Sequence, residues 1–282
     1  MSKKILLIVE GTDLEPDLIE VIANAFEQEN KYNVVSVGTN LEAFINICDK
    51  YSDSLDEVEI LDVLKEYEVN KSNPNSNNIR RLSEKYYLKY LIFDREPHDE
   101  NISEDLITNL RQIFNDEYDN GIIFINYPMA EAIYDINDIA LNKLLNKTVK
   151  IDNIKDNNYK NRVNRFNEIG FLRKVYENKR AITKFSSIKH WTNDFIDKMT
   201  LIHFLKLLTL NKISMSRYKE ENIDLFELLN ALYDLQEKRI KEDGEVYVLS
   251  TIPINFVLER KSYVIDIYNR YENTFDKLFS KR

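Results

Sequence analysis

Ile5-Leu6-Leu7-Ile8-Val9-Glu10-Gly11 decides the fold, because it joins an uninterrupted apolar run to an acidic residue and a glycine. A continuous apolar run of this length is typical of a strand buried on both faces of a parallel sheet. A helix is expected next, because Thr12 and Glu15 fit a capping box and apolar residues then recur at helical spacing: Leu14, Leu18, Ile19, Ile22 and Phe26. A strand followed by a helix begins a parallel α/β repeat.

The same alternation recurs further along the chain. Strands are expected at Val34–Val37, Tyr90–Phe93 and Gly121–Asn126, and a helical segment follows each of them. The segment Leu55–Glu68 also predicts a helix. Asn70–Asn78 is expected to be an exposed loop, because it is rich in Asn, Ser and Pro.

The chain is expected to form two domains. Residues 1–140 should form an α/β domain with a parallel sheet and helices on both faces, whose ligands sit outside the carboxyl ends of the strands. Residues 141–282 should form a mainly helical domain. Two short β-like runs in it, Val246–Leu249 and Ile254–Leu258, would form a hairpin or add to the sheet. Its clearest helical patterns are Trp191–Leu210 and Ile223–Ile240.

Composition narrows the class of protein. The 282 residues are 43% hydrophobic and 31% charged, which indicates a globular chain with a real core. The single cysteine, Cys48, cannot form an internal disulfide or a thiolate zinc cage, and is expected to be a core residue. No apolar run is long enough to span a bilayer. We therefore expect a soluble, cytoplasmic protein that makes no membrane contact.

The net charge of −9 argues against a protein that coats nucleic acid with its whole surface. One stretch differs, since residues 143–189 hold thirteen basic and four acidic side chains, with aromatic rings between them. Such rings stack on unpaired bases beside a phosphate-tracking groove, whereas the alternative is a solvated helical face with its core aromatics. Both interpretations stay open from this segment alone.

Three acids follow expected strands. Glu10 comes directly after the first strand, and Asp94 and Glu96 lie two residues apart after Tyr90–Phe93, where extended geometry would send both side chains to one side. A cluster of three carboxylates would repel itself unless a cation neutralised it, and such hard oxygen ligands suit Mg²⁺ or Mn²⁺. Each piece taken alone also fits a solvated surface acid.

The order of these blocks resembles the Toprim fold of topoisomerases, bacterial primases and OLD-type nucleases, over about the first 135 residues. More closely, three blocks resemble the RloB-like and abortive-infection Toprim proteins of bacteria: residues 7–12 with Glu15-Pro16, residues 92–99, and residues 126–131. The resemblance implies a Toprim-like Rossmannoid sheet and a phage-defence or restriction-associated nuclease. Glu96 stands where the family usually has Asp, which lengthens that arm by one methylene.

The resemblance also implies roles. Asp94 and Glu96 would hold one or two divalent ions, and Glu10 would ligate metal or shuttle a proton. Glu131 would complete a second metal site, or else would only favour a helix N-terminus through the helix dipole. Candidate substrate contacts are a glycine and basic residues near these acids and in the basic stretch: Gly11, Arg95, His98, Lys160, Arg162, Arg165, Arg173 and Lys174.

Three functions follow from these patterns. The leading one is a metal-dependent nuclease that cleaves DNA or RNA, including tRNA. The second is a phosphotransferase or phosphatase of the haloacid-dehalogenase type. Three features argue against it: His98, Glu96 and the position of the motif in the middle of the chain. The third is a non-catalytic or partner-activated effector that works with an ATPase or another defence subunit. The sequence leaves a homodimer open, and His203 is expected to be structural.

Overall fold

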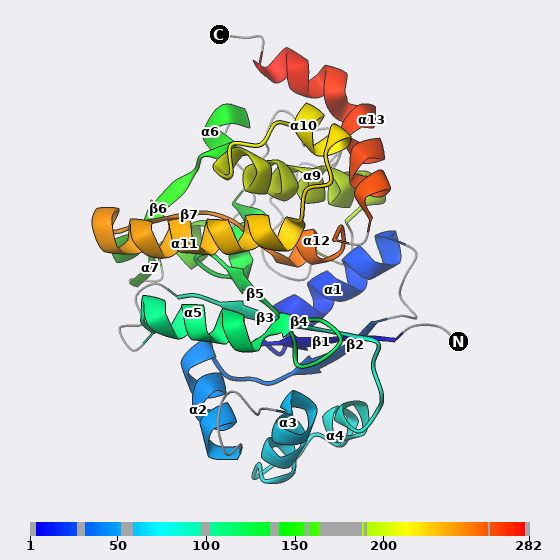
Figure 1. Ribbon diagram of the computed structural model, residues 1–282, viewed down its shortest axis with the longest axis vertical. Helices are drawn as coiled ribbons and strands as arrows, with labels where there is room; N and C mark the ends of the chain where they lie inside the picture. The colour runs from blue at the N-terminus through cyan, green and yellow to red at the C-terminus, as the bar shows by residue number, and fades with distance from the viewer. Residues whose placement is uncertain are drawn as a thin grey trace. The chain divides into compact units, whose positions relative to one another are not determined.

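The computed structural model describes residues 4–26, 32–51, 59–96, 102–135, 141–155, 158–163, 188, 191–258 and 260–279. The chain forms two compact units (Figure 1). Unit 1 comprises residues 1–95 and 99–125, and unit 2 comprises residues 96–98 and 126–282.

The sheet confirms the expected α/β class. Its strands, among the described residues, have the order β2-β1-β3-β5-β4, and β1 pairs in parallel with both β2 and β3. The short β4 pairs with β5 in the antiparallel direction. All residues of β1 and β3 are buried, which explains why their sequences are continuously apolar or nearly so. The strands are β1 Ile5–Val9, β2 Tyr32–Ser36, β3 Leu88–Asp94, β4 Asn115–Asp116 and β5 Gly121–Asn126.

Helices flank this sheet, with α1 on one side and α2, α3 and α4 on the other (Figure 1). Local capping explains two helix starts: Asn40 Oδ1 accepts the Ala43 N–H at 2.9 Å, and Ser103 caps α5 by accepting the Leu106 N–H. The helices of unit 1 are α1 Leu14–Ala25, α2 Leu41–Tyr51, α3 Ile60–Val69, α4 Ser76–Leu82 and α5 Glu104–Ile113. Residues 52–58, which include the start of the expected helix Leu55–Glu68, lie outside the described residues.

The expected loop at Asn70–Asn78 is partly wrong, because α4 begins inside it. The Asn75 side chain accepts the backbone N–H groups of Asn77 and Asn78, which starts the helix at Ser76. Asn78 is buried, and its amide donates to the Ser36 carbonyl at 3.1 Å. The polar composition of this segment therefore reflects a helix cap and a tie to β2.

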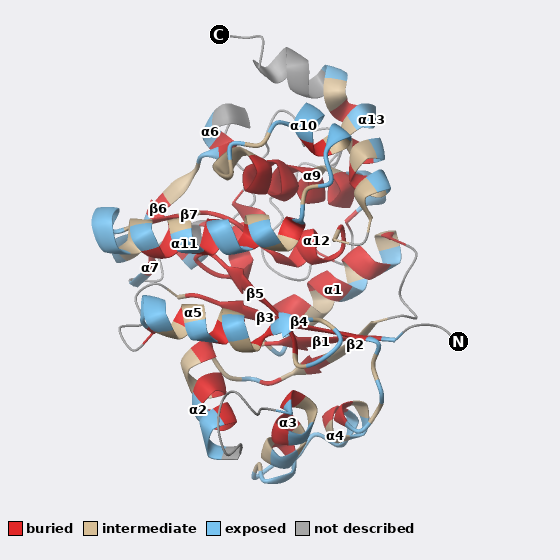
Figure 2. Cartoon of the chain, in the orientation of Figure 1, coloured by how far each residue is buried: buried red, intermediate tan, exposed pale blue. Residues whose placement is uncertain are grey.

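Unit 2 is mainly helical, as expected. Its central helix α9 is buried along most of its length (Figure 2). A small antiparallel sheet joins β6 to β7. The elements are the 3₁₀ helix η2 Ala130–Tyr134, α6 Leu141–Leu145, β6 Thr148–Lys150, α7 Ile151–Lys155, α8 Asn158–Val163, α9 Asn193–Leu210, α10 Met215–Glu220, α11 Leu225–Asp243, β7 Glu245–Tyr247, α12 Ile252–Asn255 and α13 Lys261–Phe279.

The two expected β-like runs differ in outcome. Val246 and Tyr247 lie in β7, but Ile254 and Asn255 lie in the short helix α12, so no hairpin joins the two runs. Pro253 lies in the first turn of α12, where its fixed φ favours a helix. A short apolar run does not distinguish a strand from a buried helix, which explains the error.

The compact units meet along the chain at Ile125 and Asn126, whereas the sequence placed the boundary at residue 140. The chain after β5 pairs inside unit 2, because Tyr127 and Leu249 exchange two backbone hydrogen bonds of 2.9 and 2.7 Å. Asn126 Oδ1 also accepts the Thr251 N–H at 2.8 Å. None of the helices in the described ranges is both long and apolar enough to cross a membrane.

Candidate functional site

The carboxyl ends of β1 and β3 bring Glu10 and Asp94 together. Glu10 follows β1 directly, and its backbone N–H continues the β1–β3 pairing by donating to the Ile92 carbonyl. Its carboxylate oxygen Oε2 then accepts the Asp94 N–H at 3.0 Å. Glu10 is half-buried, and Asp94 is 8% exposed. Two acids that lie 84 positions apart therefore meet at one edge of the sheet.

A third carboxylate, Glu15, lies beside this pair in the same unit. It is 5% exposed, and its Oε1 accepts the Gly11 N–H at 3.1 Å. A Cβ atom on Gly11 would lie 2.2 Å from Glu15 Oε2, so a side chain at residue 11 would displace this carboxylate. The expected capping box pairs Glu15 with Thr12, but Glu15 instead reaches back to Gly11. The sequence predicted Glu15 as part of a helix cap and of the block that carries the family resemblance, but did not predict its contact with Gly11.

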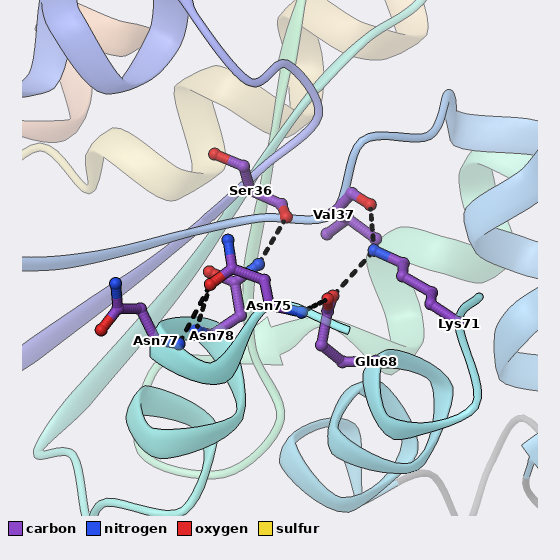
Figure 3. A network of polar contacts seen from close by, with 7 residues as sticks. All are labelled: Ser36, Val37, Glu68, Lys71, Asn75, Asn77 and Asn78. Carbon is purple, nitrogen blue, oxygen red and sulfur yellow. Dashed lines mark hydrogen bonds and ion pairs between the residues drawn. The ribbon is translucent and has the colours of Figure 1, made fainter. Parts of the chain in front are cut away.

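The neighbouring end of β2 is fixed by a polar network (Figure 3). Lys71 Nζ donates to the Val37 carbonyl at 3.0 Å and pairs with Glu68 at 2.7 Å. The other Glu68 carboxylate oxygen accepts the Asn75 N–H at 2.8 Å. The Gly38 N–H in turn donates to the Glu10 carbonyl at 3.0 Å. These contacts hold the loop after β2 beside the turn that carries Glu10.

Glu96 does not follow the extended geometry expected for Asp94-x-Glu96. Its φ is 38°, in the left-handed region that residues other than glycine rarely adopt. Its N–H donates to the Pro128 carbonyl at 3.1 Å within unit 2. The conformation costs about 1 kcal/mol, and such strain is frequent at functional sites.

The described residues contain no group of three or more His, Cys, Asp or Glu side chains placed to hold a metal ion.

Arg95, expected as a substrate contact, is turned into the interior. It is 3% exposed, and its Nη2 donates to the Ile102 carbonyl at 2.8 Å. The side chain therefore ties the end of β3 to the residue just before the cap of α5. His98, the next candidate contact, lies outside the described residues.

Glu131 lies in η2 of unit 2, and an ion pair engages it. Its carboxylate is buried, and Oε1 lies 2.7 Å from Lys160 Nζ on α8. The Lys160 side chain is 48% exposed. Two residues expected as a metal ligand and a substrate contact thus pair with each other.

The basic stretch falls largely outside the described residues, which include neither Arg165, Arg173 nor Lys174. Only the backbone of Arg162 is described, in α8. Tyr159, the first ring of the stretch, is 1% exposed. That ring is a core side chain and does not provide a surface on which bases stack.

Cys48 and His203 lie in the interior, as expected. Burial raises the pKa of the Cys48 thiol to about 12, so the thiol stays protonated at neutral pH. His203 is fully buried on α9, and its Nδ1 accepts the Ser250 N–H at 3.2 Å. Burial, together with the nearby Lys206 ammonium, lowers the pKa of His203 well below its usual value.

Comparison of the chain with protein families, with curated proteins and with solved structures finds no match.

Proposed function

We propose that this chain is a metal-dependent nuclease that cleaves phosphodiester bonds in DNA or RNA. The observation that carries the proposal is the meeting of Glu10 and Asp94 at the carboxyl ends of adjacent parallel strands, where α/β sheets bind their ligands. The strained backbone of Glu96, two residues beyond Asp94, adds support. The resemblance to RloB-like and abortive-infection Toprim proteins supplies the reaction type and a setting in anti-phage defence.

The donor set fits a hard divalent cation. Glu10 and Asp94 supply carboxylate oxygens, which Mg²⁺ and Mn²⁺ prefer, and Mg²⁺ commonly keeps several waters beside one or two protein carboxylates. Two protein ligands are therefore sufficient to hold it. A bound ion would polarise the scissile phosphate and lower the pKa of the attacking water.

The residues themselves have separate tasks in this proposal. Asp94 would hold the metal, and Glu10 would bind it or accept a proton, while its contact with the Asp94 N–H keeps both acids in register. Glu15 would fix the Gly11 turn, so that the backbone of this turn stays close to the sheet edge. The basic residues of 143–189 would attract the phosphate backbone to an otherwise acidic protein.

The test is cleavage of single-stranded DNA, duplex DNA and total tRNA by the pure protein with Mg²⁺, Mn²⁺ or a chelator. Glu10→Gln and Asp94→Asn keep side-chain size, so the fold should persist while the rate falls by about 10²-fold or more. Glu20→Gln is the matched control, because Glu20 is exposed on α1 of the same unit. Cleavage that survives both substitutions, or that ignores the chelator, would refute the assignment.

A partner-activated effector is the second candidate, and one observation favours it: Glu131 and Lys160, expected as a metal ligand and a substrate contact, form an ion pair with each other. Such a protein would cut nothing alone and would gain activity, or transmit a signal, with an ATPase or another defence subunit. Metal binding that Asp94→Asn weakens, without cleavage of any substrate, would support the effector over the self-sufficient nuclease.

A further inference from the structure

A pocket of about 370 Å³ opens in unit 1 near the amino end of β3, away from Glu10 and Asp94 at the carboxyl ends. Its walls come from the start of α3, the residues that follow α4, the second residue of β3 and the turn between β4 and β5. Its volume lies within the range of small-molecule sites in proteins. The nuclease proposal makes no use of this pocket.

Lys89 places a buried ammonium group on the pocket wall. It lies in β3, between β1 and β5 in the sheet, and is only 9% exposed. Its Nζ donates to the Tyr118 carbonyl at 2.8 Å, and it makes no ion pair with the residues that the structure describes. An ammonium group has three N–H donors, so one carbonyl leaves its hydrogen bonding incomplete. Burial lowers the pKa of Lys89, and the nearby carboxylates of Asp119, Glu59 and Asp116 oppose that effect only in part.

The wall beside Lys89 is held in place by specific contacts. Gly121 has a φ of +102°, and a Cβ atom there would lie 2.9 Å from the Lys89 carbonyl oxygen. Only glycine therefore lets the chain pass so close to β3. The Asn120 side chain accepts the Ile60 N–H at 3.2 Å, which joins this turn to α3.

The rim of the pocket is acidic. Glu59, Asp62 and Asp119 are exposed residues of the lining, and Lys65 is a half-buried one. Glu84 is already paired with Lys4 at 2.5 Å. The lining thus joins a buried cation to a ring of exposed carboxylates. A simple anion would meet repulsion at the rim, and a simple cation would meet repulsion at Lys89.

We propose that this pocket binds a small zwitterion with one amine and one carboxylate, of the kind that free amino acids provide. The ligand carboxylate would bind the Lys89 ammonium and complete its hydrogen bonding. The ligand amine would face the rim carboxylates, chiefly Asp119 and Glu59. The exposed ring of Tyr118 at the same wall would cover the apolar part of the ligand.

The test compares three probes with one carbon chain: γ-aminobutyrate, butyrate and butylamine. Common free amino acids, each added singly, extend the zwitterion set. We expect at least one zwitterion to raise the melting temperature of the full chain and to give a saturable calorimetric isotherm. Butyrate and butylamine should bind about tenfold or more weakly than the zwitterion, because each lacks one charged contact. Binding of butylamine as tight as that of the zwitterion would overturn the proposal in favour of a cation site.

Lys89→Met removes the ammonium but keeps the side-chain length. It also removes a buried charge, so the fold should be kept or stabilised, and lost binding would not reflect unfolding. We expect affinity to fall about tenfold or more in this variant. Lys85→Met is the matched control, because Lys85 is exposed and does not line the pocket. No response to any zwitterion, or a response that persists in Lys89→Met, would refute the proposal.

Discussion

Acidification should destabilise unit 2 through His203. In the unfolded chain this histidine has its ordinary pKa of about 6.5, whereas in the folded protein burial and the Lys206 ammonium hold the pKa well below that value. The folded state therefore favours the neutral ring. The contribution of His203 to the free energy of unfolding is fully present above about pH 6.5. It is lost progressively as the pH falls toward the folded pKa, because only the unfolded chain takes up the proton.

The magnitude follows from proton linkage. While the folded ring stays neutral, the free energy of unfolding falls by up to about 1.4 kcal/mol for each pH unit below 6.5. Between about pH 7.5 and about pH 5.5, the free energy of unfolding should fall by about 1.4 kcal/mol from this one group. His203→Asn removes the titration and offers an oxygen near the position of Nδ1, which can still accept the Ser250 N–H.

Tryptophan fluorescence during urea unfolding is a suitable assay. Trp191 is the only tryptophan of the chain, and it is buried in unit 2, where its ring lies 4.7 Å from that of Phe195 on the same helix as His203. Unfolding free energies of wild type and His203→Asn are measured across the pH range, and their difference isolates His203 from the other two histidines. Parallel pH curves for the two proteins would refute the reasoning, and so would a wild-type curve that rises toward acid.

Three further predictions concern unit 1. Gly11→Ala should displace the Glu15 carboxylate and reduce any metal-dependent cleavage severalfold. The unfolding midpoint should change little, because the flexible Glu15 side chain can move. Unchanged cleavage would argue that Glu15 has no part in the site. Cys48 should resist alkylation by iodoacetamide at neutral pH in the folded protein and react in urea, because its thiol is buried and its pKa is raised to about 12. Mass spectrometry measures the adduct, and an alkylated Cys48 in the folded protein would contradict the prediction. Lys71→Met should lower the free energy of unfolding by about 1–3 kcal/mol, because the buried Glu68 carboxylate would lose its cation. Urea unfolding monitored by circular dichroism measures this change. No change would show that the network in Figure 3 does not stabilise unit 1.

The sheet of unit 1 was predictable because a strand buried on both faces is mostly apolar. Ile5–Val9 and Tyr90–Phe93 carry that pattern, and the acids Glu10 and Asp94 follow at the ends where the topology brings them together. The sequence therefore predicted that both residues lie at the carboxyl ends of neighbouring strands, and their role as a metal site stays a prediction. The resemblance added a reaction type, which geometry alone does not provide.

Other features depend on contacts that sequence patterns do not reveal. The left-handed conformation of Glu96 is rare for a residue with a side chain, and it overrides the alternation on which Asp94-x-Glu96 was interpreted. The role of Asn75 as a helix cap was hidden in a polar segment that resembles a loop. Lys89 was missed because the expected strand began at Tyr90, one residue too late to show a lysine inside the sheet.

The route of the chain also limits how the protein can be divided. Glu96 belongs to unit 2 although it comes two residues after β3 of unit 1, and after Ile125 the chain continues in unit 2. A fragment that ends at Ile125 would carry Glu96 away from the Pro128 carbonyl to which its N–H donates. The complementary fragment would begin without that donor. Gene fusions, truncations and domain exchanges that cut the chain after Ile125 would therefore break the hydrogen bond between Glu96 and Pro128.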